Sequence, residues 1–158
     1  MPAEPIYRTS VDPQWIDYNG HLRDAYYGLI LSLATDALMD RLGMDAAYRE
    51  RTHCTLYTVE MHIHFLSEVH KSDVVLVNAA ILGSDAKRIH AAMRLGCAGR
   101  AEPAAAAEIM LLHIKQGQTP AVTPFPPDIA RAVEQFREQS AGTSFGPGSR
   151  QMALRSRA

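Results

Sequence analysis

Hydrophobic side chains recur at helical spacing along one long stretch of the chain. Between residues 25 and 42 the apolar residues fall three or four positions apart, and only a narrow stripe of polar residues remains. Asp24 suits the N-cap position, and Gly43 suits the position after the last turn. The pattern predicts one long central helix that is buried on most of its surface.

Apolar and polar residues alternate in the stretches that follow. The clearest alternation runs from residue 55 to residue 66 and places Tyr57 on the apolar side. Four further stretches have the character of strands: residues 6–11, 74–82, 88–97 and 105–114. Short, turn-rich links between consecutive strands indicate antiparallel pairing. We therefore expect an α+β fold in which a curved antiparallel five-stranded sheet wraps around the long helix.

The C-terminal part of the chain changes character after residue 115. Prolines between residues 120 and 127 predict an extended arm, and residues 128–139 have the amphipathic pattern of a short helix. From residue 140 onward the chain contains Gly, Ser and Arg without periodicity. We expect one domain over residues 1–139 and a disordered tail over residues 140–158.

Composition and charge exclude several classes of partner. The 158-residue chain has 16 Lys and Arg residues against 17 Asp and Glu residues, so no overall field attracts nucleic acid or an anionic membrane. No apolar run reaches the roughly 18 to 20 residues that cross a bilayer, and the N-terminus lacks the pattern of a signal peptide. The two cysteines, Cys54 and Cys97, form no disulfide framework, so we expect a cytoplasmic protein.

The expected sheet also predicts self-association. A lone five-stranded sheet leaves unpaired backbone groups along its two edges, and a second copy of the chain can pair with them. We therefore expect a homodimer or a homotetramer.

The candidate chemistry lies in the loop before the long helix. Asp17, Asn19, Gly20 and His21 precede the helix start near Ala25. Free N–H groups of residues 24 to 26 at a helix start favour negative charge and can stabilise an oxyanion. An acid beside them can act as a nucleophile or a general base on a polarised carbonyl. Each residue also has a structural alternative, such as a turn aspartate, a turn glycine, a cap or a solvent-exposed side chain.

The Asp-x-x-Gly-His loop and the order of elements together resemble the hotdog-fold acyl-CoA thioesterases, the superfamily that includes 4-hydroxybenzoyl-CoA thioesterase. The resemblance covers residues 6–115. Three segments are similar to the betainyl-CoA thioesterase group, which is associated with carnitine breakdown: WIDYNGH at 15–21, ATDALMD at 34–40 and CTLYTVEMHIH at 54–64. The sequence departs from this group at Arg23, where the group carries an asparagine.

The resemblance implies an acyl-CoA thioesterase without a cofactor. Asp17 would attack the thioester carbonyl or activate a water molecule, and Asn19 and His21 could orient it, with His21 itself as a less favoured base. Betainyl-CoA, hydrolysed to betaine and CoA, is the leading substrate. One alternative is another short or aromatic acyl-CoA, which Arg23 would suit if it pairs with an acyl carboxylate. The other is a non-catalytic acyl-CoA-binding domain.

Aromatic residues are candidates for the wall of the acyl site. An aromatic ring attracts a quaternary ammonium group, which cannot form hydrogen bonds. The candidates are Trp15, Tyr18, Tyr26, Tyr27 and, on the predicted strand, Tyr57. Packing in the core is the alternative for each ring, and the adjacent tyrosines at 26 and 27 cannot point the same way on a helix.

Charged residues on the strands give two weaker candidates. Lys87 and Arg88 stand at a hairpin end, where the resemblance implies contacts with the phosphates of CoA and where surface solubility is the alternative. Glu60, His62 and His64 share one strand face. Because zinc needs about four well-placed ligands, we expect no metal there and favour a solvated face or a subunit contact.

Overall fold

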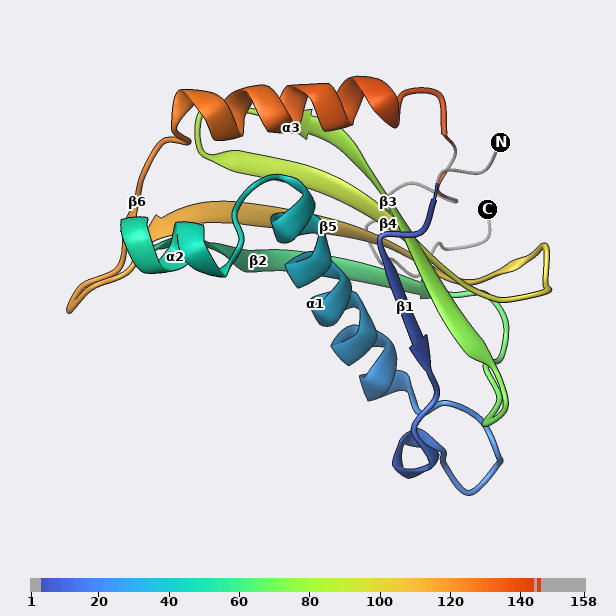
Figure 1. Ribbon diagram of the computed structural model, residues 1–158. Coiled ribbons are helices and arrows are strands. Elements are labelled where there is room, and N and C mark those ends of the chain that lie inside the picture. The colour runs from blue at the N-terminus through green and yellow to red at the C-terminus, as the bar shows by residue number, and fades with distance from the viewer. Residues whose placement is uncertain (1–3, 144, 146–158) are drawn as a thin grey trace, which may run out of the picture.

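The structure is a computed structural model, which describes residues 4–143 and 145 (Figure 1). In chain order the elements are β1 (Tyr7–Ser10), the short 3-10 helix η1 (Pro13–Trp15), α1 (Asp24–Arg41), α2 (Ala46–Thr52), β2 (Cys54–Phe65), β3 (Val74–Ser84), β4 (Arg88–Cys97), β5 (Pro103–Lys115), β6 (Ala121–Val122) and α3 (Pro127–Gln139). Among the described residues no helix is both long enough and apolar enough to cross a membrane.

The strands form one antiparallel sheet in the order β1-β3-β4-β5-β2, and the two-residue β6 pairs with β5. All neighbouring strands run antiparallel. The sheet curls, and α1 packs against its inner face (Figure 1). The predicted α+β arrangement of five strands around a long helix is therefore confirmed, and the short elements α2 and β6 add to it.

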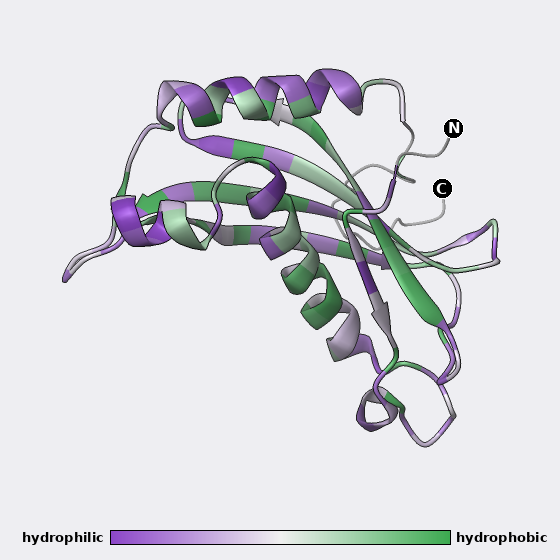
Figure 2. Ribbon diagram, in the orientation of Figure 1, coloured by the Kyte–Doolittle hydropathy of each residue, from purple (hydrophilic) through white to green (hydrophobic). Residues whose placement is uncertain are grey.

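α1 is buried because most of its surface is apolar. Ile30, Leu31 and Leu38 have no exposed surface and belong to one cluster with the inward-facing residues of the sheet. Removing a large apolar side chain of this kind from water stabilises the fold by about 1.5 to 3 kcal/mol. Figure 2 shows apolar residues along α1 and β3, whereas polar and apolar residues alternate along α3.

The start of α1 differs by one residue from the prediction. Arg23 occupies the N-cap position with extended backbone angles, and Asp24, predicted as the N-cap, is the first helical residue. The Asp24 carboxylate accepts the N–H of Ala25 at 2.8 Å. The other end agrees with the prediction, since Gly43 has a φ of 83° directly after the C-cap residue Leu42.

A β-bulge in β2 makes the predicted strict alternation wrong for the first half of that strand. The register with β5 shifts between Thr58 and Glu60, which reverses the two faces on either side of Val59. Leu56, only 8% exposed, therefore faces the core. Tyr57, predicted on the apolar face, lies on the outer face and is 39% exposed.

α3 covers an edge of the sheet that would otherwise be free. β1 pairs with β3 only as far as Val77, and α3 packs beside the rest of β3 (Figure 1). Ile129 and Val133 are buried in the core, and Ser140 Oγ accepts the N–H of Ile81 at 3.3 Å. Of the predicted tail, residues 144 and 146–158 lie outside the described residues.

Candidate active site

The loop between β1 and α1 is closed by its own backbone. The N–H of Asp17 donates to the carbonyl of His21 at 2.9 Å, and the N–H of Gly20 donates to the carbonyl of Asp17 at 3.1 Å. Gly20 has a φ of 82°, in the left-handed region that only glycine adopts without strain. Glycine adopts this conformation at the least cost, and the turn fixes the position of Asp17.

The two carboxylate oxygens of Asp17 have different surroundings. Oδ1 accepts the N–H of Asn19 at 2.8 Å and the N–H of His21 at 3.2 Å. In the part of the chain that the structure describes, no donor contacts Oδ2. Asp17 is thus held through one oxygen, while the other is available to a ligand.

The charge of Asp17 is favoured by the same contacts. Burial raises the pKa of the carboxyl, but the backbone N–H groups of His21 and Asn19, with smaller contributions from the charges of His21 and Arg23, lower it further than burial raises it. The net pKa lies below the ordinary value of 3.8. Asp17 is therefore ionised at neutral pH.

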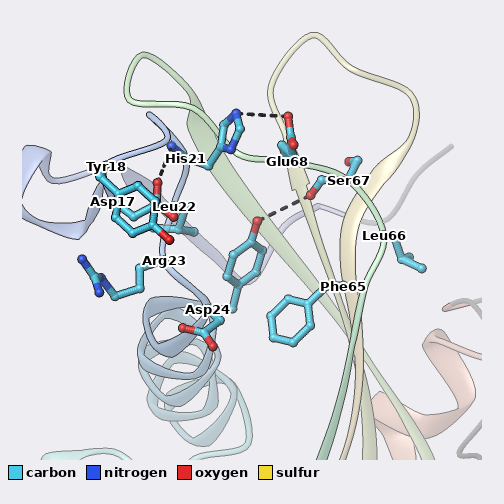
Figure 3. Close-up of a pocket in the computed structure, with 11 residues that line it drawn as sticks. Asp17, Tyr18, His21, Leu22, Arg23, Asp24, Phe65, Leu66, Ser67 and Glu68 are labelled. Atoms are coloured by element: carbon cyan, nitrogen blue, oxygen red, sulfur yellow. Dashed lines mark hydrogen bonds and ion pairs between the residues drawn. The ribbon is translucent and has the colours of Figure 1, made fainter.

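A pocket of about 580 Å³ lies between the loop and the end of β2. It is lined by Asp17, Tyr18, His21, Leu22, Arg23, Asp24 and Tyr27 from the loop and the start of α1, and by Phe65, Leu66, Ser67 and Glu68 from the end of β2 and the segment after it. Figure 3 shows these two groups on opposite sides, with Asp24 at the start of the helix between them.

Aromatic rings form part of the pocket wall. The rings of Tyr27 and Phe65 meet edge to face, with centroids 5.1 Å apart and an interplanar angle of 90°. The hydroxyl of Tyr27 donates to the carbonyl of Ser67 at 3.5 Å. Tyr18 also lines the pocket, but its side chain is 93% exposed.

Negative charge exceeds positive charge around the pocket. Asp17, Asp24 and Glu68 line it against the single guanidinium of Arg23. Glu68 Oε2 lies 3.1 Å from Nε2 of His21. The pocket therefore suits a ligand that is apolar on its surface and positive in charge.

The N-terminus of α1 supplies one free N–H group. The N–H of Ala25 donates to the Asp24 carboxylate, and the N–H of Tyr26 donates to the carbonyl of Arg23 at 3.0 Å. Within the described chain the N–H of Asp24 has no acceptor. Of the three groups predicted to form an oxyanion hole, this one is available at the positive end of the helix dipole.

The remaining aromatic candidates lie outside the pocket lining. Trp15 and Tyr26 stack on each other, with centroids 5.6 Å apart and an interplanar angle of 20°, and pack against the core. Tyr57 lies on the outer face of the sheet, in the part of β2 that precedes the bulge. The sequence analysis did not identify Phe65 as a residue of the pocket wall. Phe65 is the last apolar residue of the alternating strand, and this position could have indicated its role.

Lys87 lies in the turn between β3 and β4 and Arg88 is the first residue of β4, at the end of the sheet opposite the Asp17 loop (Figure 1). The Arg88 guanidinium is paired with Asp85, with a terminal nitrogen 2.6 Å from Oδ2. Hydrogen bonds from the side chain of Arg88 and from the backbone of Lys87 lower the pKa of Asp85 to about 2.

The histidines of β2 are not part of the pocket lining either. His62 Nε2 lies 2.8 Å from Oε1 of Glu60, and both residues lie on the outer face of the sheet. His64 shares that face, because it stands opposite Ala106 in β5.

The sequence matches the family described as the Thioesterase-like superfamily over residues 11–133. A curated relative, the betainyl-CoA thioesterase of Pseudomonas aeruginosa, is 42% identical over 132 residues, which are 84% of this chain and 82% of the relative. The L-carnitine dehydrogenase/betainyl-CoA thioesterase of Agrobacterium fabrum is 37% identical over 142 residues, 87% of this chain. The chain spans 28% of the length of that protein.

A solved structure has a similar fold. A hypothetical protein from Staphylococcus aureus, determined in complex with CoA, is 27% identical, and 94% of each chain is covered at a TM-score of 0.84. The fold and the family predicted from the loop and the order of elements are therefore confirmed. The chain belongs to the Thioesterase-like superfamily of hotdog-fold proteins.

Proposed function

We propose that the protein hydrolyses betainyl-CoA to betaine and CoA, a step in carnitine breakdown. The observation that carries this proposal is a pocket lined by three acidic residues, one arginine and aromatic rings. One of the acidic residues is Asp17, which has one carboxylate oxygen available. The trimethylammonium group of betaine cannot form hydrogen bonds, so it is recognised by ring faces and by nearby negative charge. The curated relative from Pseudomonas aeruginosa, named for this activity, adds support.

Asp17 has the properties of a nucleophile. It is ionised, Oδ1 is fixed by two backbone N–H groups and Oδ2 is available. Oδ2 would bond to the thioester carbon, the carbon–sulfur bond would break, and the CoA thiolate would leave. Water would then hydrolyse the resulting anhydride. Activation of a water molecule by Asp17 is the alternative, and the lowered pKa makes it a weak base for that role.

The start of α1 would stabilise the oxyanion of this reaction. The N–H of Asp24 has no acceptor within the described chain, and the dipole of the 18-residue helix favours negative charge there. The backbones of Asn19 and His21 act on the reaction indirectly, because they hold Asp17 in place. The imidazole of His21 faces Glu68 and not Asp17 (Figure 3).

Arg23 favours a second candidate substrate. Arg23 lines the pocket, and its guanidinium could pair with a carboxylate of a different short or aromatic acyl-CoA. A non-catalytic acyl-CoA-binding domain is less well supported, because binding alone does not require an ionised carboxylate oxygen that is available in the pocket.

We also propose that the protein is a cytoplasmic homodimer or homotetramer that forms along β2. This strand is an edge of the sheet, and its Val59 and Phe65 are each 55% exposed. Because Phe65 lines the pocket as well, a second copy on this edge would border the acyl site. For the phosphates of CoA we propose Lys87 of a second copy of the chain, since Arg88 is already paired with Asp85 and Lys87 lies at the end of the sheet opposite Asp17.

A panel of acyl-CoA thioesters tests the substrate. We expect the highest kcat/KM with betainyl-CoA, and a value roughly tenfold lower with 3,3-dimethylbutyryl-CoA, which has the same shape without the charge. Thiol release followed with a chromogenic reagent measures both rates. Equal values for these two substrates would contradict recognition of the ammonium group, and faster hydrolysis of an acyl-CoA with a carboxylate would favour the second candidate.

A further inference from the structure

We propose that His21, Glu68 and His70 form a binding site for a divalent transition metal of the zinc class at the rim of the pocket. One ligand atom of each residue lies within 4.8 Å of those of the other two. Nε2 of His21 is 3.1 Å from Oε2 of Glu68. The rings of His21 and His70 meet edge to face, with centroids 5.0 Å apart. Figure 3 shows His21 and Glu68 pointing toward each other across the rim.

Small movements bring the three ligand atoms to a metal. A point between three atoms at most 4.8 Å apart is less than about 3 Å from each of them. Zinc binds nitrogen and oxygen ligands at about 2.0 to 2.2 Å, so side-chain movements of about 1 Å complete the site. Two histidines and a carboxylate leave a fourth position for water. Two imidazoles favour zinc, cobalt or nickel over magnesium or calcium.

The backbone fixes the two segments that carry the ligands. His21 and His70 pair in an isolated antiparallel bridge, and the N–H of Leu22 donates to the carbonyl of Val69 at 2.7 Å. Asp73 Oδ2 accepts the N–H of His70 at 2.7 Å. Ligands on segments that are already ordered lose less conformational freedom when a metal binds.

Arg100 stabilises the segment from Glu68 to Asp73, which carries two of the three ligands. Its guanidinium donates to the carbonyl of Glu68 at 3.0 Å and to both carboxylate oxygens of Asp73, at 2.8 and 2.9 Å. These contacts hold the backbone that carries Glu68 and His70 in place. On the outer face of the sheet, in contrast, Nε2 of His90 is 2.8 Å from a carboxylate oxygen of Glu108 as a cross-strand pair.

A bound metal changes the pocket, because His21 and Glu68 both line it. The dication neutralises the carboxylate of Glu68 and places positive charge beside the acyl site. A cationic acyl group is then repelled. Zn²⁺ is therefore expected to raise KM for betainyl-CoA and to leave kcat unchanged. This consequence rests on the proposed function, whereas the metal site itself does not.

Titration with Co²⁺ tests the site directly, since Co²⁺ bound to imidazole and carboxylate ligands has visible absorption bands. We expect one Co²⁺ per chain, displaced by one equivalent of Zn²⁺. His70→Gln should weaken binding at least tenfold, whereas His90→Gln on the outer face is the matched control and should bind like the wild type. Absent bands, or equal binding by the wild type and His70→Gln, would overturn the site.

Steady-state kinetics then test the consequence. Zn²⁺ should raise KM of the wild type and of His90→Gln over the concentration range in which it displaces Co²⁺, and should have no effect on His70→Gln. A KM that does not respond to Zn²⁺ in the metal-binding proteins would overturn the effect on the pocket. If betainyl-CoA is not hydrolysed, the proposed function fails and the Co²⁺ titration still decides the metal site.

Discussion

Two aspartates lie in turns at opposite ends of the sheet and make nearly the same backbone contacts. Oδ1 of Asp17 accepts the N–H groups of residues 19 and 21, and Oδ1 of Asp85 accepts those of residues 87 and 88. They differ in the second oxygen. Oδ2 of Asp85 accepts Nε–H of Arg88 at 2.8 Å, whereas Oδ2 of Asp17 has no donor in the described chain.

The comparison separates a structural aspartate from a candidate catalytic one. Both side chains have a lowered pKa: for Asp85 the main cause is the Arg88 side chain, and for Asp17 the backbone N–H groups outweigh burial. A lowered pKa therefore marks no active site by itself. The difference is that Asp17 keeps one oxygen available beside a pocket and a helix N-terminus.

The largest expected effect is the difference between replacing Asp17 and replacing Asp85. Asp17→Asn should lower kcat by at least about a thousandfold, because the amide is neither a nucleophile nor a base. Asp85→Asn is the matched control, with kcat within about twofold of the wild type. Thiol release and thermal unfolding measure activity and folding for both. Similar losses in the two variants would show that the turns matter only for structure.

The second effect concerns how the turn holds Asp17. Gly20→Ala should lower kcat roughly tenfold, because a side chain at a φ of 82° costs about 1 to 2 kcal/mol. A Cβ there meets no atom within 4 Å, so the effect comes from the backbone alone. Gly20→Asn should recover part of the activity, since Asn tolerates this region. Equal activity of the wild type and the two variants would show that the backbone conformation at residue 20 does not affect catalysis. The Asp85 turn has no residue with positive φ among residues 85 to 88.

The third effect concerns the charge of the pocket. Asp24→Asn should raise KM for betainyl-CoA roughly fivefold, because an exposed charge pair contributes up to about 1 kcal/mol. The amide can still accept the N–H of Ala25, and KM for 3,3-dimethylbutyryl-CoA should stay unchanged. Parallel kinetics with the two substrates check this. An equal rise in KM for both would mean that Asp24 acts through the helix start and not through the ammonium group.

The smallest expected effect lies at the Asp85 end of the sheet. Lys87→Ala should raise KM for acyl-CoA about twofold, with kcat unchanged, because exposed ion pairs are weak and screened by salt. Arg131→Ala, an exposed cation on α3, is the control. KM measured at low and high salt checks the role of charge. Identical KM values for Lys87→Ala and Arg131→Ala would show that Lys87 does not bind CoA.

The sequence predicted correctly those elements in which burial sets the spacing of apolar residues. α1 was found because Ile30 and Leu38 belong to a helical apolar pattern, and the loop was found because Asp17 and Gly20 have recognisable turn chemistry. Tyr57 was placed on the wrong face because nothing in the local pattern marks the bulge near Val59, where pairing with β5 overrides strict alternation.

The rest of the site depends on contacts between distant segments. Phe65 and Glu68 reach the pocket only because β2 ends beside the start of α1, more than 40 residues earlier in the chain. No local spacing predicts that contact. For the same reason the sequence could not distinguish Asp17 from a structural turn aspartate, since the distinction depends on whether a neighbour such as Arg88 covers the second oxygen.

A crystal structure of the Asp17→Asn variant with betainyl-CoA bound tests the central claim most directly. We expect the thioester carbon about 3 to 3.5 Å from the residue 17 side chain, the carbonyl oxygen at the N–H of Asp24, and the trimethylammonium group against Tyr27 and Phe65. A thioester bound away from residue 17, or an ammonium group directed away from these rings, would contradict the account.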